Sequence, residues 1–139
     1  MEKVKEKYIV LVSGSRDWND SVLIQQKLSE LDNFIQSTLK QVPVLVHGAC
    51  ARGADALANH IIENQFQNWE IQKYPAQWDL YGRSAGPKRN TQMLSETRPH
   101  AILIFCKDNS PGSTDMINKS EAYKKSKGSR LQKLEIFRN

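Results

Sequence analysis

Residues 42–62 read VPVLVHGACARGADALANHII, and this stretch contains three successive patterns. The first, Val42–His47, is almost continuously apolar, which is typical of a strand buried on both faces of a parallel sheet. Gly48 and Gly53 follow, and glycines let a loop backbone turn closely. The apolar spacing of one helix face then occurs at Ala54, Leu57, Ala58, Ile61 and Ile62. The stretch therefore predicts a strand, a tight loop and a helix.

The same alternation extends over the rest of the chain. Four further apolar runs predict strands at Tyr8–Val12, Trp69–Tyr74, Ala101–Cys106 and Leu131–Phe137. The runs at 69–74 and 131–137 carry more polar residues, so we expect them at the edges of the sheet. Helices are expected over the periodic apolar residues 24–35, from near Pro87, and around residues 116–123 before Gly128.

Strands that alternate with helices of about ten to fifteen residues imply parallel pairing through right-handed crossovers. We therefore expect an α/β fold, with a doubly wound, mostly parallel five-stranded Rossmann-like sheet and helices on both faces. The 139 residues fit one domain, residues 1–139, which is long enough to bury a core without disulfide or metal staples.

The composition excludes several classes of protein. A charged fraction of 25% is typical of a soluble globular protein, and no apolar run approaches the roughly 18 residues that span a bilayer, so no membrane partner is expected. Cys50 and Cys106 show no CxxC spacing, and the apolar stretch near the N-terminus is not followed by a cleavage pattern. We expect reduced thiols and a cytoplasmic location. No spacing of His, Cys or Asp indicates a metal site, and no cofactor is expected.

The net charge of +5 is unevenly distributed. Residues 1–118 carry 13 basic and 13 acidic side chains, so the excess lies in residues 119–139. A basic segment of this kind attracts phosphate-bearing partners, but a solvated helix face explains it more simply.

Ligands of open α/β sheets bind beyond the carboxyl ends of the strands, so the loops that follow the predicted strands form the candidate site. After the first strand, Gly14 lets the backbone turn, Ser15 offers a hydroxyl, and Arg16 offers a planar fork that suits phosphate or carboxylate. An ordinary turn, with Arg16 paired to Asp17, explains the same residues.

The loop after the second predicted strand starts with His47 and Gly48 and reaches Gly53 and Asp55. Two glycines that lead straight into a helix suggest a ligand close to the helix N-terminus, although neither GxGxxG nor the GK[ST] of a P-loop is present. Asp55 is expected either to cap the helix or to hold a ribose hydroxyl. A histidine at a strand end, such as His47, is more typical of a structural side chain than of a base.

The loop after the third predicted strand brings Arg83, Lys88 and Arg89 towards one helix N-terminus. That end of a helix is already positive, so unpaired cations repel one another there and a bound polyanion resolves the conflict. Trp78 and Tyr81 either stack on a base or plug the end of the sheet. The ligand-binding residues expected in this segment are Arg83, Gly86, Arg89 and Asn90.

The loop after the fourth predicted strand places Gly112, Ser113 and Thr114 at a helix start. These residues fit a phosphate cradle, and they also fit a turn followed by a helix cap. Four loops of this kind on one edge of a sheet favour a nucleotide-like ligand.

Four motifs in the same order resemble the YspA-like branch of the SLOG superfamily. They are GSRDW at 14–18, HGACARGADALA at 47–58, YGRSAGPKRNTQML at 81–94 and GSTDMI at 112–117. Relatives in this superfamily include the cytokinin-activating "lonely guy" phosphoribohydrolases, a DNA-processing protein, and sensor domains for nucleotide signals. The resemblance implies strand-end loops that bind a nucleotide or phosphoribosyl ligand, and it implies a homodimer.

In the phosphoribohydrolases, an arginine and a glutamate of a PGGxGTxxE motif carry the reaction. The resemblance places that arginine on Arg89 and the glutamate on Met116, so the acid is missing and Asp115 is the candidate replacement. We therefore rank a nucleotide-binding sensor or sequestering module first. A nucleoside monophosphate phosphoribohydrolase or other N-glycosidase ranks second, and a single-stranded nucleic-acid binder ranks third.

Overall fold

The computed structural model describes residues 5–108 and 110–139 as five strands that alternate with helices. The strands are β1 (Lys7–Gly14), β2 (Val42–His47), β3 (Glu70–Lys73), β4 (Ala101–Cys106) and β5 (Lys133–Arg138). The longer helices are α1 (Ser21–Asn33), α2 (Ala54–Gln65), α4 (Ala85–Thr97) and α5 (Pro111–Lys125). Three short segments complete the set: η1 (Phe34–Thr38), α3 (Trp78–Tyr81) and η2 (Gly82–Ser84).

All five strands are parallel and lie in the order β3-β2-β1-β4-β5, which confirms the predicted Rossmann-like sheet. The central strand β1 pairs on both sides, with Val10 opposite Leu45 of β2 and Ala101 of β4. The more polar strands β3 and β5 lie at the edges, as expected. The strand order reverses between β1 and β4, and such a switch point opens a crevice at the carboxyl ends of the strands.

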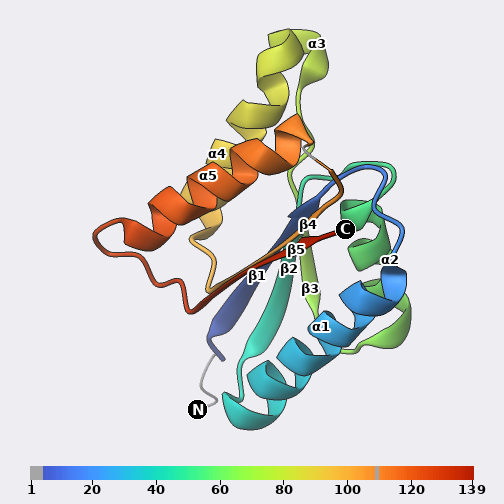
Figure 1. The fold of residues 1–139 in the computed structure, drawn as a ribbon. Coiled ribbons are helices and arrows are strands. Elements are labelled where there is room, and N and C mark those ends of the chain that lie inside the picture. The colour runs from blue at the N-terminus through green and yellow to red at the C-terminus, as the bar shows by residue number, and fades with distance from the viewer. Residues whose placement is uncertain (1–4, 109) are drawn as a thin grey trace.

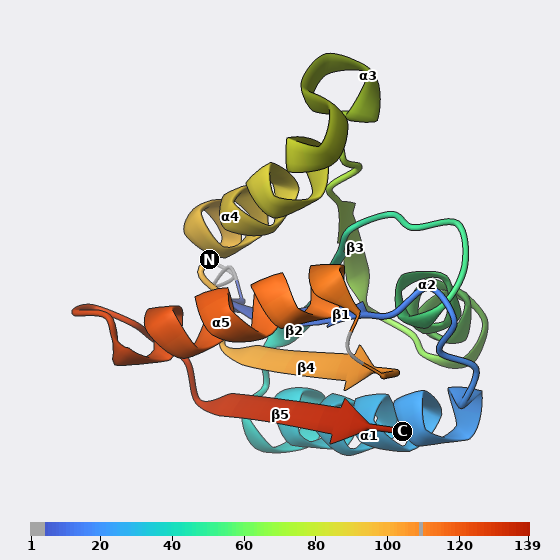
Figure 2. The same cartoon turned by 45° about the horizontal axis from the view of Figure 1, so that its top comes forward.

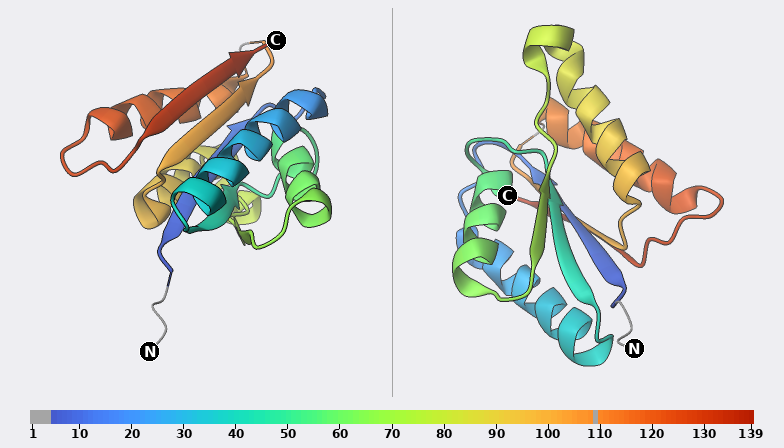
Figure 3. Two further views of the ribbon diagram at one scale, coloured as in Figure 1. Left: turned by 90° about the horizontal axis from the view of Figure 1, so that it is seen from below. Right: turned by 180° about the vertical axis from the view of Figure 1, so that it is seen from behind.

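The two faces of the sheet are covered by different pairs of helices (Figures 1 and 3). Helices α1 and α2 cover one face, where Val10 and Leu103 point, and α4 and α5 cover the other, where Leu11 and Ile104 point. Alternate residues of β1 and β4 are thus buried on opposite faces. This two-sided burial explains why both strands are almost continuously apolar.

The helices differ from the sequence expectation in three places. Helix α4 begins at Ala85, so Pro87 occupies its first turn, where a missing N–H costs nothing. Helix α1 continues directly into the π-helical turn η1. The segment 75–86, which was expected to be a loop, contains α3 and η2, and α3 projects beyond the end of the sheet (Figure 2). No residue of α3 is buried, so no apolar periodicity marks it in the sequence.

Among the described residues, no helix has the length and apolar character needed to cross a membrane.

Candidate ligand-binding site

A cavity of about 620 Å³ opens at the switch point between β1 and β4. Its walls come from residues 13–17 after β1, from Lys107, Asp108 and residues 110–112 after β4, and from the first turns of α4. Trp78 of α3 closes one side, and Cys50 and Asp55 line it from the segment after β2. A cavity therefore lies at the location that the sequence predicts for the site.

Gly14 and Gly53 allow close backbone approach beneath this cavity. A Cβ atom on Gly14 would lie 2.3 Å from the carbonyl oxygen of Phe105 and 2.6 Å from the Cβ of Ala54. Gly53 has a φ of +80°, and a Cβ there would lie 2.2 Å from the carbonyl oxygen of Ser15. Both glycines thus bring α2 and β4 against the loop that follows β1.

The hydroxyl of Ser15 joins the two loops at the switch point. Its Oγ accepts a hydrogen bond from the backbone N–H of Lys107 at 2.8 Å, and it lies 3.3 Å from the Lys107 carbonyl and 3.4 Å from the Ser113 Oγ. Ser15 and Ser113 are both buried. The structure therefore uses both hydroxyls to hold the loops after β1 and β4 together.

Asp55 orders the loop after β2. Its Oδ2 accepts hydrogen bonds from the backbone N–H groups of Gly48, at 3.1 Å, and Cys50, at 3.3 Å. Burial raises the pKa of the Asp55 carboxyl above its usual range, while nearby positive groups and the amide donors oppose that rise. Burial, followed by the charge of Asp55, also raises the pKa of the Cys50 thiol, which keeps this sulfur protonated.

His47 is engaged by groups inside the fold. The backbone N–H of Ala49 donates to its Nδ1 at 3.0 Å, so the opposite nitrogen, Nε2, is available to donate to the Asn59 Oδ1 at 2.9 Å. His47 is buried and does not line the cavity.

Arg89 binds the protein backbone from the first turns of α4. Its Nη1 donates to the carbonyl oxygen of Gly48 at 2.5 Å and to that of Tyr74 at 3.3 Å. Its Nε donates to the Asn90 Oδ1 at 3.0 Å. The guanidinium thus holds the segments after β2 and β3 together while it still lines the cavity.

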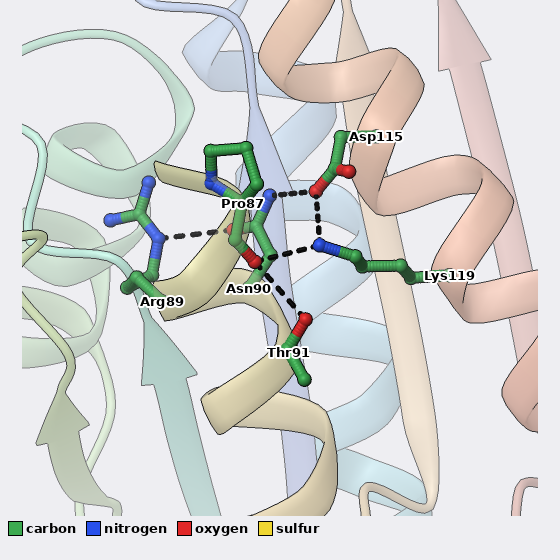
Figure 4. Close-up of polar contacts among 6 residues, drawn as sticks. All are labelled: Pro87, Arg89, Asn90, Thr91, Asp115 and Lys119. Atoms are coloured by element: carbon green, nitrogen blue, oxygen red, sulfur yellow. Dashed lines mark hydrogen bonds and ion pairs between the residues drawn. The ribbon is translucent and has the colours of Figure 1, made fainter. Parts of the chain in front are cut away.

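Asn90 links this arginine to α5 (Figure 4). Its Nδ2 donates to the Oδ2 of Asp115 at 3.0 Å, and the same carboxylate oxygen pairs with the Lys119 Nζ at 2.9 Å. Lys119 also donates to the Pro87 carbonyl at 2.7 Å. Asp115 is not among the residues that line the cavity, so its observed contacts connect α5 to the start of α4.

Four cationic side chains line the cavity: Arg16, Arg83, Arg89 and Lys107. The carboxylates of Asp17, Asp55 and Asp108 also line it. Lys88, which was expected to join the cationic cluster at the start of α4, instead lies with its Nζ 4.7 Å from the ring centroid of Tyr81. It does not line the cavity, so the cluster there is smaller than the sequence suggested.

Nine of the expected ligand-binding residues line the cavity: Gly14, Ser15, Arg16, Asp55, Arg83, Gly86, Arg89, Asn90 and Gly112. Gly48 lines an adjoining hollow of about 450 Å³. Neither hollow is lined by His47, Gly53, Ser113, Thr114 or Asp115. The Thr114 hydroxyl donates within the first turn of α5, to the Ser110 carbonyl at 3.0 Å.

Sequence reasoning did not select Lys107 or Cys50 as ligand-binding residues, and it left Trp78 open between stacking on a base and plugging the end of the sheet. Lys107 directly follows the buried strand β4, so the sequence already placed it at the edge of the sheet where the site was expected. Cys50 reaches the cavity through the path of the loop after β2, which carries no sequence signal, and Trp78 reaches it from α3. Within residues 5–108 and 110–139, no three His, Cys, Asp or Glu side chains are grouped as metal ligands.

A parallel α/β sheet with a cavity at its switch point is the architecture of a Rossmann-like domain, and ligands of such domains bind at this location. The chain belongs to the YAcAr family, the YspA, cpYpsA-related SLOG family, whose model matches residues 8–81. Membership of this family indicates a ligand related to nucleotides. The match ends with α3, so the cavity walls from α4 and from the loop after β4 lie beyond it.

Among known proteins, the chain is similar to the Gene 61 protein of Mycobacterium phage D29, with 33% identity over 91 residues. The alignment covers 61% of this chain and 66% of the phage protein. No solved structure matches the chain significantly.

Proposed function

We propose that the cavity binds a nucleotide or a related phosphoribosyl compound, and that the protein acts as a nucleotide sensor or sequestering module. The observation that carries this proposal is the set of Arg16, Arg83 and Lys107 around one cavity. None of the three forms a salt bridge with a described residue. Cations that share a cleft repel one another, and a phosphate group would neutralise that repulsion.

The remaining walls suit the other parts of a nucleotide. Gly112 lies in the first turn of α5, where a Cβ would meet nothing within 4 Å, so a ligand can approach the backbone closely. Asp55 uses Oδ2 for its two amide bonds and lines the cavity, which suits it to accept a hydrogen bond from a ribose hydroxyl.

A thermal-shift screen tests the proposal with AMP, ADP-ribose, NAD and cyclic nucleotides, and with inorganic phosphate as the control. A ligand at one hundred times its Kd stabilises the folded state by about 2.7 kcal/mol, which raises the Tm by roughly 10 °C for a domain of this size. A screen in which no nucleotide raises the Tm above the phosphate control would refute the proposal.

Two matched variants locate the ligand. Arg83→Gln removes an exposed cation from the cavity, whereas Lys88→Gln removes an exposed cation of α4 that faces Tyr81. We expect the first to reduce the nucleotide-dependent shift and the second to leave it unchanged. Equal effects of both would show that the cavity is not the binding site. Arg89 is less suitable, because its substitution would also release the backbone of Gly48 and Tyr74.

The buried carboxyl of Asp55 favours a second candidate function, N-glycosidic hydrolysis of a nucleotide. Asp55 lines the cavity, and burial raises the pKa of its carboxyl, which suits it to donate a proton to a leaving base. Water then adds to the sugar carbon and returns a proton to the carboxylate, which gives a free base and a ribose phosphate. Asp115, the candidate replacement for the glutamate that is missing at Met116, does not line the cavity. Chromatography of nucleotides incubated with the protein tests this function, and the absence of free base from every nucleotide would exclude it for that set.

The basic C-terminal segment gives no support to a polymeric ligand at the cavity. Lys124 and Lys125 lie at the last turn of α5, and the cavity lies at its first turn. A helix of 15 residues is about 22 Å long, so these lysines stand far from the proposed site.

A further inference from the structure

The projecting helix α3 carries three exposed apolar side chains, and Trp78 differs from the other two. Trp78, Leu80 and Tyr81 are 47%, 67% and 45% exposed. Of the three, only Trp78 lines the cavity. Its ring lies 5.5 Å from the guanidinium carbon of Arg16, and a Cβ on Gly86 would come within 3.3 Å of it. The indole is therefore held between the loop after β1 and the first turn of α4.

Trp78 also stands where the two hollows meet. The cavity of about 620 Å³ and the adjoining hollow of about 450 Å³ are both lined by Arg16, Cys50, Trp78 and Arg89. The adjoining hollow is otherwise walled largely by small uncharged residues, among them Ala49, Ala51 and Ala76. A ligand that extends from one hollow into the other would pass these four shared residues, and the indole is the one aromatic ring among them.

We propose that Trp78 is the base-stacking residue of this site, with the ligand's heteroaromatic base lying against the indole. This inference rests on the proposed nucleotide function. An indole offers a large flat apolar surface that accepts any base, and the guanidinium of Arg16 supplies a planar cation beside it. The phosphate then reaches Arg83 and Lys107 in the larger cavity. Tyr81 is excluded from this role because it lines neither hollow and faces Lys88.

The test compares ligands with and without a base. The probes are AMP, GMP, CMP and UMP, and ribose 5-phosphate presents the same sugar and phosphate without the base. Binding is measured by calorimetry for the wild type, for Trp78→Ala and Trp78→Phe, and for the control Tyr81→Ala, which removes an exposed aromatic ring from the same short helix.

We expect Trp78→Ala to weaken nucleotide binding by between about 5-fold and about 150-fold, the range of one lost stacking contact. The affinity for ribose 5-phosphate should stay the same. Trp78→Phe should retain part of the nucleotide affinity, and Tyr81→Ala should retain all of it. In the wild type, the nucleotides should quench tryptophan fluorescence and ribose 5-phosphate should not. Trp18 is buried, and neither it nor Trp69 lines the cavity, so the quenching should vanish in Trp78→Phe.

The outcomes separate the two proposals. If the wild type binds nucleotides and ribose 5-phosphate equally well, the phosphate site stands and the stacking role is wrong. An equal loss of both ligands in Trp78→Ala would show that the ring only supports the structure, which also overturns stacking. If the wild type binds none of these compounds and no nucleotide raises the Tm in the thermal-shift screen, the nucleotide function and the stacking role are both wrong.

Discussion

Replacing Gly14 with alanine tests the close backbone approach on which the cavity is built. The new Cβ would lie 2.3 Å from the Phe105 carbonyl oxygen, where ordinary contacts begin near 3.4 Å, so the ends of β1 and β4 must separate by roughly 1 Å. The same carbonyl oxygen accepts the backbone N–H of Ser15 at 2.9 Å, and that hydrogen bond weakens as the strands separate. Overpacking costs about 1–3 kcal/mol and a lost hydrogen bond about 1 kcal/mol, so we expect a loss of about 2–4 kcal/mol.

Urea denaturation measures this loss. With a slope of about 2 kcal/mol per molar urea, the midpoint of Gly14→Ala should fall by about 1–2 M. Gly112→Ala is the matched control, because a Cβ there meets nothing within 4 Å and the residue is helical. Its midpoint should stay the same or rise, since alanine favours a helix over glycine by up to about 1 kcal/mol. Equal midpoints for Gly14→Ala and the wild type would refute the reasoning.

Two further variants probe buried polar groups. Asn90→Leu leaves the Nε of Arg89 without its acceptor and removes the hydrogen bond to Asp115. We therefore expect the free energy of unfolding to fall by about 2–4 kcal/mol. A loss below about 1 kcal/mol in urea denaturation would contradict this expectation. Burial, and then neighbouring arginine charges, lower the pKa of His100 to about 4 from its usual 6.5, so the unfolded chain binds more protons than the native protein between these values. The free energy of unfolding should therefore fall as the pH drops from 6.5 to 4, and it should fall less in His100→Gln. Urea denaturation at pH 7.5 and at pH 5 measures this loss, and an equal loss in the wild type and in His100→Gln would refute the role of His100.

The strands were predictable from the sequence where burial is complete on both faces. The bounds of β2 and β4 agree with the expected runs Val42–His47 and Ala101–Cys106. Both faces of such a strand are buried, so apolar residues are favoured at nearly every position. Helix α3 was missed for the opposite reason. Its four residues contact little of the core, so no periodicity records their conformation.

The location of the candidate site could be predicted from the sequence, but most of the hydrogen bonds between its residues could not. The carboxyl ends of parallel strands must meet at one edge, which locates the cavity from strand order alone. The sequence predicts that Arg89 binds the ligand, and this residue does line the cavity. The sequence does not predict that its guanidinium also donates to the carbonyl oxygens of Gly48 and Tyr74. Those acceptors lie 41 and 15 residues away in the chain, and only the folded path of their loops brings them to the arginine.

The central position of β1 has a consequence for synthesis of the chain. Of the five strands, β1 is made first, and one of its edges pairs with β2, but the other edge has no partner until residues 101–106 have been made. During that interval an apolar strand edge is open to pairing with another nascent chain. The hydrogen bond from the Lys107 N–H to the Ser15 hydroxyl likewise cannot form until Lys107 has been made. The cavity is therefore complete only after β4 and the start of α5 have been added, and chains cut short before residue 101 would lack it and keep the exposed edge.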